Sequence, residues 1–264
     1  MTHNIVSKSA DAIEKARAEG RPALIGFLPA GYPTKEDCIE AILQLGRNGV
    51  DIVEVGIPYS DPVMDGPVIQ AATSEVLAKG FRVSEVFDII KAVTDQSEMT
   101  VLVMTYWNIV DRMGVEEFAR RLAEAGGSGI ITPDLVPEEA DEWVTASDKY
   151  GLDRVFLTSP TSSVERVQNI VNISRGFVYG VSVMGVTGAR EDVSDAAERV
   201  VAEAHAAGAP RVCVGLGVSK REHVVEIGRY ADGVIVGTAL VRALGEGGPQ
   251  AVGQLAAQLA GRNA

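Results

Sequence analysis

Three carboxylates lie close together in the sequence, where an apolar run gives way to a loop. Glu54 interrupts the run 51–58, and Asp61 and Asp65 follow in the loop. The run is typical of a strand with apolar neighbours on both faces, so we expect Glu54 inside the protein. An ionised group buried without a partner costs on the order of several kcal/mol. The pattern therefore favours acid/base chemistry at this strand end.

Each of these carboxylates also has a structural interpretation. Glu54 could pair with a Lys or Arg, although basic residues are scarce near the predicted strand ends. Asp65 precedes Gly66-Pro67 and could cap the helix that follows. Asp61 stands in Ser60-Asp61-Pro62, where a turn role is at least as good an account. The residue types alone leave these alternatives open.

Three glycine-bearing segments suggest a phosphate site. They are Gly185-Val186-Thr187-Gly188, Gly215-Leu216-Gly217 and Gly237-Thr238-Ala239. Glycine lets backbone N–H groups approach a phosphate closely, and a helix N-terminus adds a favourable dipole. A tight turn explains any one segment equally well, but together they favour an anionic ligand. The first segment continues through 185–192 as a candidate lid.

The elements that must position these residues alternate along the whole chain. Eight apolar, β-branched runs are separated by amphipathic stretches of helical period. The predicted strands are 23–30, 51–58, 100–107, 127–134, 153–160, 176–183, 211–218 and 232–236. The predicted helices are 5–18, 34–48, 67–79, 83–94, 115–125, 137–150, 163–173, 192–207, 220–230 and 251–259.

Alternation of this kind predicts a parallel sheet with right-handed crossovers. Eight units in 264 residues favour a (β/α)₈ barrel over an open doubly wound sheet. The opening helix and the helix 83–94, between strands two and three, are additions to that plan. No Pro- or Gly-rich linker divides the chain, so we expect residues 1–264 to form a single domain.

Barrels of this class place their active sites at the carboxyl ends of the strands. That rule selects Glu54, Asp61 and Asp65, together with further polar residues and the glycine segments after strands six to eight. The further polar residues are Tyr106, Asn108, Asp134 and Tyr179. The three histidines fall elsewhere, and no His/Cys/Asp cluster has the spacing of metal ligands. Acid/base work would fall to carboxylates or to a tyrosine, and we expect no metal.

Composition excludes several classes of partner. The formal net charge is −12 and no cluster of Lys and Arg is present, so nucleic acid and an anionic membrane surface are poor partners. No apolar run approaches the roughly 18 residues of a membrane span, and no secretory signal is found. Two cysteines, expected as buried thiols, fit a reducing cytoplasm.

With these residues in place, the chain closely resembles the α subunits of tryptophan synthases. The most specific stretch runs from Glu54 to Gln70 through Pro-Tyr-Ser-Asp-Pro, Asp-Gly-Pro and Ile-Gln. The resemblance extends over essentially the whole chain. It also includes Phe27, Ala30-Gly31-Tyr32-Pro33, Tyr106, Asn108, Asp134 and the three glycine segments.

The resemblance implies retro-aldol cleavage of indole-3-glycerol phosphate to indole and glyceraldehyde 3-phosphate. By resemblance, Glu54 is the mobile acid/base and Asp65 is the partner of the indole nitrogen. It further implies a supporting tyrosine and an indole slot, and a phosphate site of backbone N–H groups and a hydroxyl. The supporting tyrosine is Tyr179, and Phe27 and Met104 form the indole slot. The phosphate site consists of Gly188, Gly217, Gly237 and Thr238.

The family also implies a partner, the pyridoxal-phosphate-dependent β subunit, in an α₂β₂ heterotetramer. No cofactor is implied for this subunit. The loop containing Asp61 and the lid containing Thr187 are where the family couples its two active sites. Two other interpretations of the barrel remain: a phosphosugar isomerase, which would lack the pattern from Glu54 to Gln70, or a catalytically silent barrel that only binds.

Overall fold

The computed structural model describes residues 6–181, 190–215 and 217–262, and within them it confirms the predicted barrel. Nine parallel strands pair in the order β5-β4-β3-β2-β1-β9-β8-β7-β6. The strands are β1 Ala23–Pro29, β2 Ile52–Gly56, β3 Thr100–Met104, β4 Gly129–Ile131, β5 Asp153–Val155, β6 Leu157–Thr158, β7 Val178–Val181, β8 Val212–Gly215 and β9 Gly233–Val236.

The presence of nine strands does not add a ninth unit to the barrel. β5 and β6 are parts of one predicted run, separated only by Phe156. β5 pairs with β4 and β6 pairs with β7, and the Phe156 carbonyl accepts a hydrogen bond of 3.0 Å from the Tyr179 N–H. One continuous segment therefore joins the two ends of the strand order, which closes the eight-unit barrel.

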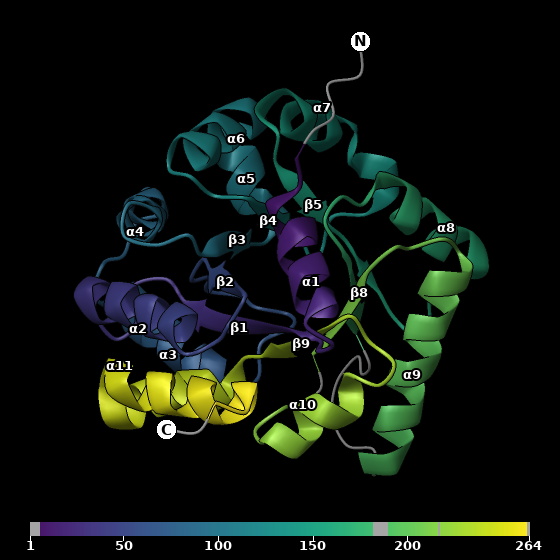
Figure 1. Cartoon of the computed structure of the whole chain (residues 1–264). Helices are drawn as coiled ribbons and strands as arrows, with labels where there is room; N and C mark the ends of the chain where they lie inside the picture. Colours follow the sequence, from purple (N-terminus) through teal and green to yellow (C-terminus); the bar gives the residue numbers. More distant parts are fainter. Residues whose placement is uncertain (1–5, 182–189, 216, 263–264) are drawn as a thin grey trace.

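Helices surround the strands, and one of them, α1, lies across an end of the barrel (Figure 1). They are α1 Lys8–Ala18, α2 Lys35–Arg47, α3 Pro67–Ala78, α4 Glu85–Thr94, α5 Trp107–Met113, α6 Val115–Glu124, α7 Asp141–Tyr150, α8 Val164–Ile173, α9 Arg190–Ala206, α10 Arg221–Ile227 and α11 Thr238–Ala260. Within the described ranges no helix is long and apolar enough to cross a membrane.

Local sequence explains where several helices begin. The Thr34 hydroxyl accepts a hydrogen bond from the Asp37 N–H and caps α2, and Ser163 caps α8 in the same way. Pro67 opens α3 at the position where its missing N–H costs nothing. In α11 the chain breaks at Gly248, whose φ of 67° is left-handed, so the predicted helix 251–259 is the second part of a longer interrupted helix.

Two further predicted elements differ from the structure. The third strand ends at Met104, and the chain turns into α5 instead of continuing to residue 107. The Trp107 N–H at the start of α5 donates to both oxygens of Asp134, at 2.9 and 3.0 Å, and this tertiary contact is invisible in a local pattern. The predicted helix 137–150 is divided into a 3₁₀ turn, Pro137–Glu139, and α7.

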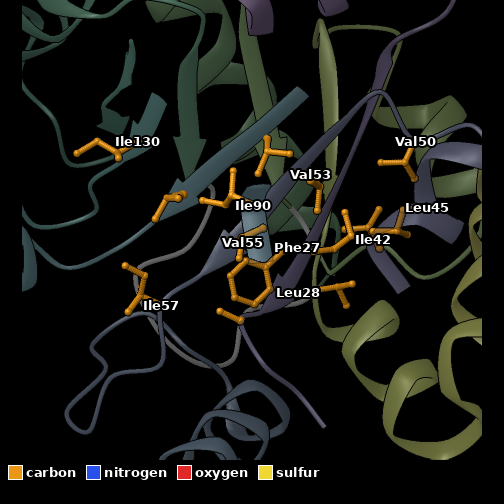
Figure 2. Close-up of a cluster of buried hydrophobic side chains, with 14 of the residues drawn as sticks. Phe27, Leu28, Ile42, Leu45, Val50, Val53, Val55, Ile57, Ile90 and Ile130 are labelled. Carbon is orange, nitrogen blue, oxygen red and sulfur yellow. The ribbon is translucent and has the colours of Figure 1, made fainter. Parts of the chain in front are cut away.

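The core has two layers, one on each side of the strands. The outer layer packs the strands against the helices, and Figure 2 shows part of it, with Ile42 and Leu45 of α2 beside Leu28 and Val53. The inner layer fills the barrel lumen, mainly with strand residues. Ile13 and Ala16 of α1 are fully buried in that inner layer, so α1 closes the end of the lumen where the strands begin.

Candidate active site

A cavity of about 500 Å³ opens where the strands end, as the barrel rule predicts. Residues from loops and strand ends around the barrel meet in it, including both predicted catalytic carboxylates. Its lining is Phe27, Glu54, Met64, Asp65, Gly66, Ile69, Met104, Leu157, Tyr179, Val181, Gly215, Gly217, Val218, Ser219, Ile235, Gly237, Thr238, Ala239 and Arg242.

Glu54 occupies the floor of this cavity. Its side chain is 1% exposed, and neither carboxylate oxygen has a hydrogen-bond partner among the described residues. Burial raises the pKa of Glu54 to about 8, because removal from water penalises the charged form. The group therefore carries its proton at neutral pH and can give it up without leaving the physiological range.

Asp65 lies above it, in the loop between β2 and α3. It is half-buried, and desolvation raises its pKa. The N-cap of α3 is Gly66, and no side-chain hydrogen bond caps this helix. The capping interpretation of Asp65 is therefore wrong, and the residue lines the cavity instead.

The aromatic and thioether side chains form an apolar side of the cavity. Phe27 and Glu54 are register partners on neighbouring strands, and Gly56 leaves room for the phenyl ring, since a Cβ there would lie 2.5 Å from it. Tyr179 is opposite, with its hydroxyl 3.0 Å from where a Cβ of Gly215 would be. Burial first, and then the nearby charge of Glu54, raise the pKa of Tyr179. Met104 ends β3 beside them.

The side of the cavity formed by β8 and β9 has a different character. Gly217 adopts a φ of 56°, and a Cβ there would meet nothing within 4 Å, so this backbone faces open space. Gly237 precedes the N-terminus of α11, and Thr238 is its first residue. Open backbone, a helix N-terminus and a hydroxyl together form the kind of site that binds phosphate.

Arg242 also lines this side, and the sequence analysis missed it. Among the described lining residues it is the only Lys or Arg. It lies four residues after Thr238 on α11, so helical spacing places both on one face. The spacing of four residues from Thr238 is the sequence feature that indicates Arg242. The barrel rule selects residues at strand ends, and Arg242 lies beyond them, in the second turn of a helix.

Several strand-end residues support the loop after β2 and do not line the cavity. The Tyr106 hydroxyl accepts hydrogen bonds from the N–H groups of Val63 and Met64, at 2.8 and 3.0 Å. The Asn108 amide donates to the Tyr59 hydroxyl at 3.1 Å. Asp134 holds the start of α5, as described above. These contacts anchor the loop that carries Asp65.

Asp61 is exposed in the same loop and accepts a hydrogen bond from the Ser60 hydroxyl. It does not line the cavity. Thr187, Gly188 and most of the predicted lid lie outside the described residues. His205 contacts Asp232 away from the cavity, and His223 accepts from the Ser219 N–H. The part of the chain that the structure describes holds no group of three His, Cys, Asp or Glu residues able to bind a metal.

Fold and cavity together define a (β/α)₈ barrel whose cavity is lined by two carboxylates and by the glycine-rich ends of β8 and β9. Residues 13–262 match the family model described as the tryptophan synthase alpha chain. The chain therefore belongs to the tryptophan synthase alpha chain family.

Individual relatives agree over almost the full length. The tryptophan synthase alpha chain of Leifsonia xyli subsp. xyli is 51% identical over 97% of this chain and 98% of the relative. That of Mycobacterium marinum is 55% identical over 92% and 90%. The solved tryptophan synthase of Mycobacterium tuberculosis superposes with a TM-score of 0.91 at 48% identity, over 97% of this chain and 98% of that one.

Proposed function

We propose that this chain is the lyase subunit of a tryptophan synthase and cleaves indole-3-glycerol phosphate to indole and glyceraldehyde 3-phosphate. The observation that carries the proposal is the meeting of Glu54, Asp65 and the glycine wall of β8 and β9 in one cavity. Family membership supports the same reaction.

The reaction needs two proton transfers and stabilisation of the charge that develops at the indole N–H. Carbon 3 of the indole gains a proton, so that the ring becomes an electron acceptor. The bond between carbon 3 and the side chain then breaks, and its electron pair returns to the ring. The hydroxyl on the neighbouring side-chain carbon loses its proton as the aldehyde forms. Indole and the aldehyde together account for every atom of the substrate.

Glu54 suits the proton transfers because its raised pKa keeps it protonated at neutral pH. Asp65 is the second carboxylate, and we assign it to the indole N–H, where it stabilises the positive charge that develops in the ring. Phe27 and Met104 hold the indole, with Tyr179 supporting Glu54. The phosphate is bound by Gly217, Gly237 and Thr238, and by Gly188, which lies outside the described residues.

The partner is a pyridoxal-phosphate-dependent β subunit, which receives the indole, in an α₂β₂ assembly in the cytoplasm. We assign Asp61 and Thr187 to the coupling of the two sites. The exposed position of Asp61, on a loop that also carries Asp65, supports this assignment. The whole chain, residues 1–264, acts as one barrel domain.

Indole release from indole-3-glycerol phosphate by the purified chain tests the reaction, with and without a β subunit. We expect weak activity alone and higher activity with the partner, because the lid must close. Asp65→Asn lowers the rate at least about 10²-fold, the scale for losing a catalytic carboxylate. Asp95→Asn removes the same charge from an exposed ion pair on α4 and serves as the matched control.

Absence of indole release from the complex with a β subunit would overturn the proposed reaction. Equal rates with and without the partner would contradict the coupling, and normal turnover by Asp65→Asn would contradict its role. Sedimentation of the mixed subunits measures the stoichiometry.

A further inference from the structure

A second, smaller chamber of about 210 Å³ adjoins the main cavity at the carboxyl ends of β4 and β6. The two spaces share three wall residues, which are Met64, Leu157 and Val181. The smaller chamber is otherwise lined by Thr132, Pro133, Leu135, Val136, Pro137, Phe156, Thr158, Ser159, Arg166 and Ile170. Most of these side chains are apolar, and the proposed reaction uses none of them.

The position of the chamber relative to the substrate follows from the two ends of the main cavity. The phosphate end is formed by Gly217, Gly237 and Thr238, after β8 and β9. In the barrel, β3 and β4 lie across the lumen from that end, and β6 belongs to the segment that follows β4 in the strand order. A substrate anchored by its phosphate therefore extends its aromatic end toward Met104 and Leu157, and Leu157 belongs to the wall shared with the chamber.

The shared wall consists of side chains that can yield. Leu157 projects into the lumen beside its register partner Tyr179, and it is only partly buried. Met64 is a flexible thioether on the loop held by Tyr106, and Met side chains adapt readily to the shape of a ligand. A small group attached to the aromatic ring would meet this wall before any backbone.

We propose that the chamber is a subsite for apolar substituents on the benzene ring of the substrate. It takes methyl or halogen groups on indole-3-glycerol phosphate, and the side chains of Leu157 and Met64 set how large they can be. This inference rests on the proposed cleavage reaction. It adds a substrate range that depends on the wall shared by the two spaces and on the residues of the chamber.

Four ring-methylated substrates, with the methyl at position 4, 5, 6 or 7, test the subsite against the parent compound. We expect kcat/KM for at least one position to equal or exceed that of the parent by up to about fourfold, the effect of burying one methyl group. Val136→Phe fills the chamber and should lower the ratio of methylated to parent kcat/KM about tenfold, the scale of overpacking. The ratio cancels differences in folded fraction.

Val171→Phe makes the same change on α8 outside the chamber lining and should leave the ratio as in the wild type. If Val136→Phe does not fold, Ile170→Ala enlarges the chamber instead and should raise the ratio for bromo-substituted substrate about threefold. Rejection of all four methyl positions, or no change of the ratio in the chamber variants, would overturn the subsite. Failure to cleave the parent compound would instead overturn the proposed reaction.

Discussion

Carboxylates at the two ends of the barrel have opposite surroundings, and Asp51 and Glu54, before and within β2, are an example of each. Asp51, just before the strand, receives two hydrogen bonds from the Arg21 guanidinium, at 2.7 and 2.8 Å, and one from the Leu24 N–H. Glu54, within the same strand, has no such partner among the described residues. Each carboxylate described here at the end closed by α1 has a hydrogen-bond or ion-pair partner, whereas Glu54 at the open end has none among the described residues.

Other carboxylates extend this comparison. Asp153 begins β5 and accepts hydrogen bonds from the Ser9 N–H and hydroxyl of α1, at 3.1 and 2.6 Å. Asp232 precedes β9 and binds Arg17 and the Val212 N–H. These contacts join α1 to the strands and link neighbouring strands to one another. An unsatisfied group such as Glu54 costs stability, and a role in chemistry explains why it is present.

The largest effect is expected at the open end. Glu54→Gln should lower indole release at least about 10²-fold, because an amide cannot exchange the proton. The folded protein should be no less stable than the wild type at neutral pH. Steady-state kinetics and thermal unfolding measure the two quantities. If Glu54→Gln lost activity only because it unfolded, the result would contradict a catalytic role for Glu54.

At the closed end the effect should fall on stability. Asp51→Asn removes the charge that pairs with Arg21 and should lower the free energy of unfolding by about 1–3 kcal/mol. Turnover per folded molecule should remain that of the wild type. Urea unfolding measures the change. Asp88→Asn, in the exposed ion pair with Lys35, is the control and should cost about 0–1 kcal/mol. Equal losses in both variants would contradict the assignment.

A pH series sharpens the comparison further. Between about pH 4.5 and 8 the folded chain holds a proton on Glu54 that the unfolded chain has released. The contribution of Glu54 to stability therefore falls as the pH rises through this range, on the order of 1 kcal/mol per pH unit, and is constant above it. Unfolding of wild type and Glu54→Gln at several pH values isolates this contribution. A difference that does not change with pH would show that Glu54 is not desolvated.

The smallest effect is expected at Arg242. Arg242→Gln should raise the KM for indole-3-glycerol phosphate about three- to tenfold, the effect of one partly solvated charge near the phosphate. The kcat should change less than the KM, and added salt should reduce the difference from the wild type. Arg229→Gln, which removes an exposed charge outside the cavity lining, is the matched control. Similar KM values for both variants would remove Arg242 from the phosphate site.

The sequence predicted the barrel because each strand is buried on both faces and reads as an apolar run. The placement of Glu54 in the lumen followed from the same pattern, and the helices followed from the amphipathic stretches between the runs. Tertiary contacts account for what the pattern missed. Asp134 starts α5 from a different strand, and Phe156 interrupts a run that looks continuous because its two sides pair with different neighbours.

The candidate site was predictable to the extent that strand ends define it. Both carboxylates, Phe27, Tyr179 and the glycines after β8 and β9 come together as expected. Asp61 and Asp65, which look equivalent in sequence, are separated by the fold, because the Tyr106 hydroxyl holds Val63 and Met64 between them. These hydrogen bonds join residues that are 43 and 42 positions apart in the sequence, so no local sequence pattern indicates them.

The placement of α1 has a consequence for the order of events in a catalytic cycle. Ile13 and Ala16 fill the far end of the lumen, so that end of the barrel offers a ligand no passage. Both products of the proposed cleavage must then leave from the mouth of the cavity, on the side where the strands end. Whatever covers that mouth governs both the residence time of the first product and the arrival of the next substrate.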